Sequence, residues 1–200
     1  GLGDVYKRQL VHLLNRLYDL PDGCGKITIG GVDIRDIDRQ YLRSQIGMVL
    51  QEPFLYSGSI KENVGITKEI SEFDDIREAC EIACVDSAID SFTDGYETIV
   101  GERGVTLSGG QKQRAAVCRA IITRPELILA DEPTGNLDSK STIEIMNILK
   151  DLHKSGRTVI IITHNQALAP MADRLIHIKN GQVARMESNE NPTSIDEIEW

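Results

Sequence analysis

Large aromatic side chains are scarce in this sequence: Phe, Trp and Tyr together make up 4% of its 200 residues. A core with few rings has to be aliphatic, and a hydrophobic fraction of 40% supplies enough such side chains for a domain of this length. No apolar run reaches the length of a membrane span, and the chain does not open with a signal peptide. We therefore expect it to serve any membrane process from the soluble side.

Cysteine and basic residues are also few. Four cysteines in 200 residues indicate no disulfide framework. Cys80 and Cys84 lie one helical turn apart, but no second pair of Cys or His residues lies nearby, which favours idle thiols over a metal site. The 22 Lys and Arg residues against 31 Asp and Glu residues give a net charge of −9, which argues against nucleic acid as a partner.

Hydrophobic patterning predicts an α/β fold. Unbroken aliphatic stretches at 46–50, 127–130 and 158–163 are typical of strands in a parallel sheet that is covered on both faces. Apolar residues at helical spacing predict helices at 7–18, 71–84, 85–91, 110–122 and 139–154, with Ser71 as an N-cap. We expect a mostly parallel sheet flanked by helices, with an inserted all-helical subdomain over residues 54–124.

The segments around these elements are predicted to be loops and turns. Residues 95–106 are rich in glycine and charge, which indicates a loop. The Asn-Gly pair at 180–181 predicts a hairpin between strands at 174–179 and 182–185. From residue 186 onward five acidic residues occur without Lys or Arg, so we expect a domain over 1–186 and an acidic, flexible tail over 187–200.

A glycine-rich turn leads into the helix predicted at 110–122. Its sequence is Leu-Ser-Gly-Gly-Gln at residues 107–111. Gly109 and Gly110 let the backbone approach an anion, and the free N–H groups at the helix N-terminus point to the same place. Ser108 adds a hydroxyl donor. An ordinary N-cap would explain the serine but not the Gly-Gly-Gln that follows it.

Two adjacent carboxylates, Asp131 and Glu132, follow the buried strand at 127–130. At a strand end they project to different sides, so one can hold Mg²⁺ and the other can orient or deprotonate water. A helix-capping acid pair is the alternative. That alternative is weakened by the four aliphatic residues before the pair and by its distance of twenty residues from the glycine turn.

Gln51 and His164 also come directly after predicted buried strands. Ligands of parallel sheets bind at the carboxyl ends of the strands. The Gln51 amide can reach a metal ion or its water, and a neutral His164 imidazole can donate to a terminal phosphate. A loop glutamine and a surface histidine would be the simpler interpretations if either residue stood alone.

These motifs in this order resemble the nucleotide-binding domain of an ABC transporter. Residues 107–111 match the family's signature, 128–132 its Walker B strand with the catalytic glutamate, and 136–138 (Asn-Leu-Asp) its D-loop. Gln51 matches the Q-loop and His164 the switch histidine. The resemblance covers about residues 10–185 and implies a P-loop NTPase-like fold that binds and hydrolyses ATP with Mg²⁺.

The resemblance also implies how the residues are used. Two ATPase domains, from a homodimer or a heterodimer, pack head to tail around two ATP molecules at the cytoplasmic face of the cell membrane and drive a transmembrane domain. Glu132 would be the general base, and Asp131 and Gln51 would serve Mg²⁺. His164 would hold the γ-phosphate. Across the dimer, the partner's ATP would be contacted by Ser108, Gly109, Gly110, Gln111 and Asp138.

Two stretches differ in the subtype that they resemble. Residues 54–60 and 101–104 are similar to exporters of the multidrug and lipid type. Residues 131–139, with Pro-Thr-Gly-Asn at 133–136, look more like stand-alone ATPases of lipoprotein-release and macrolide-export systems. We favour an exporter with an unusual D-loop over a join of two sequences. Two further hypotheses are a soluble stand-alone ABC-type ATPase and a non-catalytic module that lends its signature to a partner.

The family's P-loop has its counterpart in residues 1–8, where the match is incomplete. Gly1 and Lys7 stand at the required spacing, so Lys7 is the candidate phosphate-binding lysine. Tyr6 replaces the glycine before that lysine, and its ring would obstruct a turn that needs free backbone angles. Arg8 replaces the hydroxyl residue that binds Mg²⁺ and cannot ligate a cation.

We therefore predict that the chain as given binds ATP weakly or not at all, because its phosphate cradle is degenerate. Calorimetric titration of the purified chain with ATP and Mg²⁺ measures this directly. Micromolar affinity would contradict the prediction.

Overall fold

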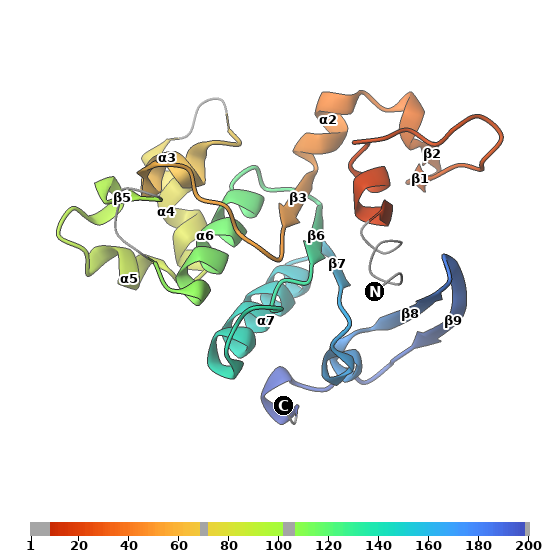
Figure 1. Cartoon of the computed structure of the whole chain (residues 1–200). Coiled ribbons are helices and arrows are strands. Elements are labelled where there is room, and N and C mark those ends of the chain that lie inside the picture. The colour runs from red at the N-terminus through yellow and green to blue at the C-terminus, as the bar shows by residue number, and fades with distance from the viewer. Residues whose placement is uncertain (1–8, 69–71, 102–106, 199–200) are drawn as a thin grey trace. The chain divides into compact units, whose positions relative to one another are not determined.

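A computed structural model of the chain describes residues 9–68, 72–101 and 107–198. The helices and strands are numbered in chain order, and Figure 1 shows the labels of most of them. The chain divides into two compact units, one of residues 45–161 and one of residues 1–44 together with 162–200. Each unit is described by itself.

The sheet of the first unit contains the three strands expected from the sequence. They are β3 (Ile46–Val49), β6 (Leu127–Asp131) and β7 (Thr158–Ile162), in the order β3-β6-β7. β3 and β6 are parallel, with Val49 opposite Ala130. Ile128, Leu129 and Ala130 are all buried without alternation, which confirms that β6 is a strand covered on both faces.

Two long helices pack in this unit. α6 (Gly109–Ile121) lies so close to β3 that a Cβ atom added to Gly47 would stand 2.3 Å from the backbone oxygen of Ala120. α7 (Ser139–Lys154) has the bounds predicted from its apolar spacing. Its buried face contains Ile145, Met146, Leu149 and Leu152.

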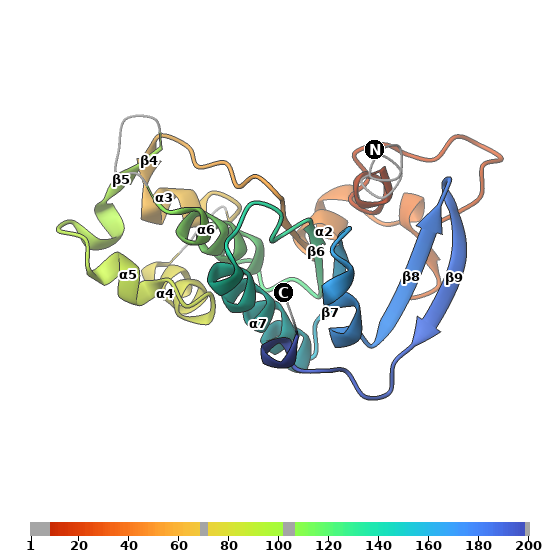
Figure 2. The ribbon, with the colours of Figure 1, turned by 60° about the horizontal axis from the view of Figure 1, so that its bottom comes forward.

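The inserted subdomain is mainly helical, as expected. α3 (Ile60–Gly65), α4 (Phe73–Ile82) and α5 (Asp86–Asp90) gather around α6 (Figure 2). α4 is N-capped at Glu72 without a side-chain hydrogen bond. Ser71, the predicted cap, lies outside the described residues.

The prediction of an all-helical insertion is wrong in one detail. β4 (Gly58–Ser59) pairs antiparallel with β5 (Ile99–Val100), and a 3-10 turn, η2 (Gly95–Glu97), precedes β5. β5 and η2 lie in residues 95–106, which were expected to form a loop, and β4 lies where no strand was predicted. Two-residue strands carry too little alternation to be recognised from sequence.

The second unit contains shorter elements. Residues 9–14 are helical. β1 (Thr28–Ile29) pairs antiparallel with β2 (Val32–Asp33), and η1 (Ile34–Asp36) and α2 (Arg39–Ser44) follow. The buried Arg16 donates to the backbone oxygens of Ile34 and Ile37 at 3.0 and 2.9 Å, and so ties the end of the first helix to η1.

The predicted hairpin is present and longer than expected. β8 (Arg174–Lys179) and β9 (Gln182–Ser188) pair antiparallel around Asn180 and Gly181, whose φ values of 53° and 74° suit a tight hairpin turn. β7 is followed by η3 (Gln166–Met171). The hairpin therefore extends into the residues assigned to the tail.

The expectation of a wholly flexible tail is also wrong in part. β9 continues through Ser188, and a 3-10 turn, η4 (Ile195–Glu197), carries the fully buried Ile195. Between them the Asn189 side chain donates to the backbone oxygen of Pro170 at 2.8 Å. One apolar side chain and one side-chain amide thus order a segment whose composition is polar.

We predict that Ile145→Ala destabilises the chain by about 2–5 kcal/mol, because it removes three carbons from a fully buried position on α7. Urea unfolding followed by circular dichroism measures this. Ile82→Ala on α4 is the matched control, since Ile82 is 40% exposed. Equal losses for the two variants would contradict the packing described for α7.

Candidate active site

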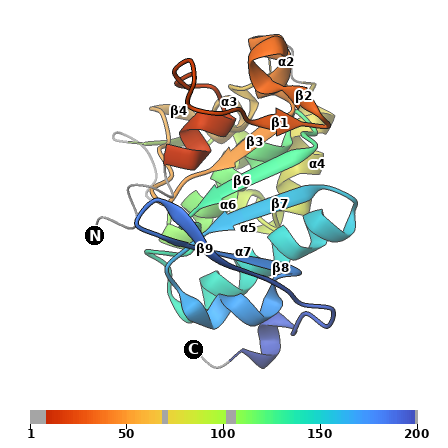
Figure 3. The same cartoon turned by 90° about the vertical axis from the view of Figure 1, so that its right-hand side faces the viewer.

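The carboxyl ends of β3 and β6 bring three predicted residues together. The two strands lie side by side (Figure 3), and their register sets Gln51 and Glu132 each two residues beyond the pair Val49–Ala130. Asp131 is the last residue of β6 and is 6% exposed, and Glu132 is 7% exposed. Carboxylates so deeply placed need polar or cationic surroundings to remain charged.

Glu132 has an unusual backbone conformation. Its φ of 47° lies in the left-handed region, which residues other than glycine seldom adopt. Glu132 is the first residue after β6, and the Gly135 N–H donates to the Glu132 backbone oxygen at 3.1 Å to close a turn. Backbone strain of this kind concentrates at functional sites, where it fixes the direction of a side chain.

Gln51 lies against the same turn. A Cβ atom added to Gly135 would stand 2.9 Å from the Gln51 Nε2 atom. Within the described residues no group of three or more His, Cys, Asp or Glu side chains could hold a metal ion. A cation here would have one or two protein ligands, which is how Mg²⁺ is usually held beside phosphates. The Asp131 carboxylate and the Gln51 amide oxygen are suitable ligands.

The glycine-rich turn forms a second cluster at the start of α6. The Ser108 hydroxyl accepts from the Gln111 N–H at 3.2 Å, and the Gln111 side-chain oxygen accepts from the Ser108 N–H at 2.9 Å. This capping box makes Ser108 the N-cap of α6. The ordinary N-cap that was the alternative interpretation is therefore present, and it accounts for Gln111 as well. The hydroxyl proton of Ser108 and the N–H groups of Gly109 and Gly110 lie at the positive end of the helix dipole, which suits an anion.

The loop before α7 lies beside this turn. A Cβ atom on Gly109 would stand 3.5 Å from Leu137 Cδ2, and one on Gly110 would stand 2.7 Å from Ser141 Oγ. Gly110 is therefore required for this close approach. Asp138 caps α7 by accepting from the Ser141 N–H at 2.9 Å and the Ser141 hydroxyl at 3.1 Å. The signature turn and Asp138 consequently belong to one surface.

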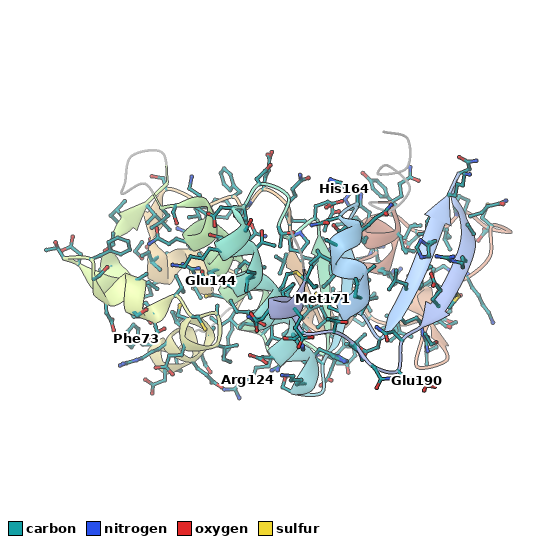
Figure 4. All side chains as sticks on the ribbon, turned by 90° about the horizontal axis from the view of Figure 1, so that it is seen from below. Phe73, Arg124, Glu144, His164, Met171 and Glu190 are labelled. Carbon is teal, nitrogen blue, oxygen red and sulfur yellow. The ribbon has the colours of Figure 1, made fainter. Side chains whose placement is uncertain are left out.

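Helix α6 contributes three residues that sequence reasoning missed. Gln113 is 1% exposed and donates from Nε2 to the Leu50 backbone oxygen at 2.9 Å. Arg119 donates to the Phe54 backbone oxygen at 2.9 Å. Arg114 forms an ion pair with Glu144 of α7, which is labelled in Figure 4. A polar residue on the buried face of a helix, as Gln113 is, was the signal available in the sequence.

Two predicted site residues are not assigned to either cluster. His164 is exposed and follows β7, and Asn165 rather than His164 caps η3. His164 belongs to the other unit, so its place beside Glu132 stays a prediction. Lys7 lies outside the described residues.

The family model described as ABC transporter matches residues 7–135, which is more than half of the chain. The chain belongs to the ABC transporter family. This confirms the resemblance drawn from the signature, the Walker B strand and the Q-loop.

The similar proteins include ABC exporters of the multidrug class. The chain is 42% identical over 186 residues to multidrug resistance protein pgp-1 of Caenorhabditis elegans, which covers 93% of this chain and 14% of that protein. It is 43% identical over 178 residues to ABC transporter B family member 4 of Dictyostelium discoideum, covering 89% and 23%. The chain thus spans less than a quarter of the length of these two relatives.

A solved structure agrees in fold. The chain superposes on a bacterial Atm1-family ABC exporter with ATP bound at a TM-score of 0.82 and 32% identity, covering 91% of this chain and 31% of that one. The fold is therefore that of an ABC exporter ATPase domain. In the described ranges every helix falls short of the length and apolar character that a membrane crossing requires.

We predict that the contribution of Asp138 to stability depends on pH. Its hydrogen bonds from the Ser141 N–H and hydroxyl lower the pKa of the carboxyl below its ordinary value of 3.8. A lowered pKa means that the stabilisation is complete above the ordinary value and is lost as the pH falls through the folded-state value.

The measurement compares the free energy of unfolding of the parent and of Asp138→Asn at several pH values from about 6 down to 3. The difference between the two should shrink in the acidic part of this range. A difference that stays constant with pH would contradict a role for the charged carboxylate in capping α7.

Proposed function

We propose that this chain is the ATP-hydrolysing domain of an ABC exporter, which powers transport across a membrane by dimerising with a second ABC ATPase domain. The observation that carries the proposal is the β3–β6 register, which sets Gln51, Asp131 and Glu132 at one edge of the sheet. Homology to multidrug exporters supports the direction of transport. A transmembrane domain would be the further partner, at the cytoplasmic face of the membrane.

Each residue at the sheet edge has a role that its position supports. Glu132 orients the attacking water and accepts its proton, because its strained backbone fixes the direction of its carboxylate. Asp131 and Gln51 would hold Mg²⁺. When bound, Mg²⁺ neutralises charge on the β- and γ-phosphates of ATP. His164 donates a hydrogen bond to the γ-phosphate from the end of β7.

The signature cluster serves the partner's nucleotide rather than the chain's own. Ser108, Gly109 and Asp138 are all exposed, and Gly109 lies against Leu137, the residue before Asp138. Gln111 is used locally, since its side-chain oxygen completes the capping box. An exposed, preorganised anion site on a helix N-terminus suits contact with phosphates that another subunit holds.

A second candidate function follows from residues 1–8. Tyr6 and Arg8 depart from the P-loop pattern, so the chain could act as a non-catalytic partner that supplies only its signature surface. A soluble stand-alone ABC-type ATPase is the third hypothesis. Replacing Tyr6 by Gly and Arg8 by Ser completes the P-loop pattern and provides a parent in which catalysis can be tested.

In that restored parent we predict that Glu132→Gln lowers kcat at least about 100-fold, because it removes the general base. ATP binding should persist, and the dimer should accumulate. Steady-state hydrolysis with size-exclusion chromatography in ATP measures both.

Glu126→Gln is the matched control. Glu126 is an exposed glutamate just before the opposite end of β6, and its substitution should leave hydrolysis unchanged. Unchanged turnover in Glu132→Gln would rule out the general-base role. The non-catalytic hypothesis would be favoured if the restored parent did not hydrolyse ATP even when a catalytically active partner chain supplied the signature.

A further inference from the structure

The segment that carries Gln51 is held at its start by α6. The Gln113 side chain is 1% exposed, and its Nε2 atom donates to the Leu50 backbone oxygen at 2.9 Å. Leu50 immediately precedes Gln51. A buried amide that donates to this carbonyl therefore fixes the peptide from which the Gln51 side chain projects.

The same segment is also held further along. Arg119 of α6 donates to the backbone oxygens of Phe54 and Asn63 at 2.9 and 3.0 Å. Its guanidinium lies 5.6 Å from the centre of the Tyr56 ring. The Asn63 side chain in turn accepts from the Tyr56 backbone N–H at 2.8 Å through Oδ1, and donates from Nδ2 to the Tyr56 backbone oxygen at 2.9 Å. The backbone from residue 50 to residue 56 is thus held by hydrogen bonds from α6 and, at Tyr56, from Asn63 of α3.

Gly135 limits where the Gln51 side chain can lie. A Cβ atom at residue 135 would stand 2.9 Å from the Gln51 Nε2 atom and 3.4 Å from its Cδ and Cγ atoms. The backbone of Gly135 is not in the left-handed region, so the position needs glycine for space and not for its φ angle. Gly135 is itself joined to Glu132 by its N–H at 3.1 Å.

We propose that Gln113 and Gly135 are positioning residues that aim the Gln51 amide at the edge of the sheet occupied by Asp131 and Glu132. Gln113 sets the origin of the side chain, and Gly135 provides the surface on which its amide rests. The inference rests on the proposed function, because the role of Gln51 at Mg²⁺ and phosphate is proposed there.

Because of this arrangement, a substitution at Gly135 can change the position of the Gln51 amide without changing the stability of the chain. The atoms that a Cβ at residue 135 would meet belong to the end of a flexible, half-buried side chain, which can rotate away at little cost. Gly135→Ala should therefore move the Gln51 amide without unfolding the chain. A misplacement of about 1 Å in a catalytic group can reduce the rate by up to about 100-fold.

The first test uses the chain as given and needs no nucleotide. In a sample labelled with ¹⁵N-glutamine, the side-chain amide signal of Gln51 is assigned by its loss in Gln51→Ala. Gly135→Ala and Gln113→Met should each shift that signal, while the melting temperature of Gly135→Ala stays at the parent value. An unshifted Gln51 signal in Gly135→Ala would overturn the proposal.

The second test measures ATP hydrolysis in the restored parent. Gly135→Ala should lower kcat about tenfold with KM for ATP unchanged, and should raise the Mg²⁺ concentration needed for half-maximal rate. In a Gln51→Ala background the same substitution should have no further effect, because it acts through Gln51. An equal loss in both backgrounds would overturn the proposal.

The two tests distinguish the two ideas. A shifted Gln51 signal together with an inactive restored parent would leave the positioning intact and contradict the proposed function. ATP hydrolysis by the restored parent together with an unshifted Gln51 signal in Gly135→Ala would support the proposed function and contradict the positioning.

Discussion

The parallel pairing of β3 with β6 is the constraint on which the rest of the site depends. A slip of one residue would turn every side chain of a strand to the other face. Val49, Ile128 and Ala130 are fully buried, and β6 is covered on both faces, so such a slip would replace fitted contacts on both faces of the sheet. Aliphatic packing thereby fixes which residues emerge at the strand ends. The polar residues that emerge there need no long-range interaction of their own to be brought together.

Helix α6 joins this sheet edge to the exposed signature turn. Its backbone contacts β3 at Gly47, its N-terminus contacts the start of α7 through Gly110, and Arg114 pairs with Glu144. A displacement of the signature turn would therefore shift both ends of α6, because tightly packed elements move together. This gives a physical route by which contact with a partner at Ser108 could bias the residues around Gln51.

The sequence predicted those elements whose signals were local and repeated. The bounds of α7 followed from its apolar period, and α6 followed from its apolar spacing and the glycine-rich turn before it. β4 and β5 were missed because two residues carry no pattern. The regular structure within residues 187–198 was missed because the burial of Ile195 depends on residues distant in the chain.

Some residues of the candidate site could likewise be recognised from the sequence, and others needed the structure. Gln51, Asp131, Glu132 and the signature residues stand out because each has an unusual place in the pattern. Gly135 carries no such signal in the sequence, since its reason for being glycine is the approach of the Gln51 side chain from the segment after β3. The role of Gln113 likewise needed the position of the Leu50 carbonyl. Contacts of this kind are visible only in three dimensions.

The proposed function requires that the signature turn and the acid pair of one chain serve different ATP molecules. The most direct measurement mixes Ser108→Arg and Glu132→Gln chains, both in the restored parent, and follows ATP hydrolysis. Each variant alone should be nearly inactive. The mixture should regain about a quarter of the parent rate, because about half of the dimers are mixed and each mixed dimer keeps one intact site. No recovery on mixing would contradict the claim.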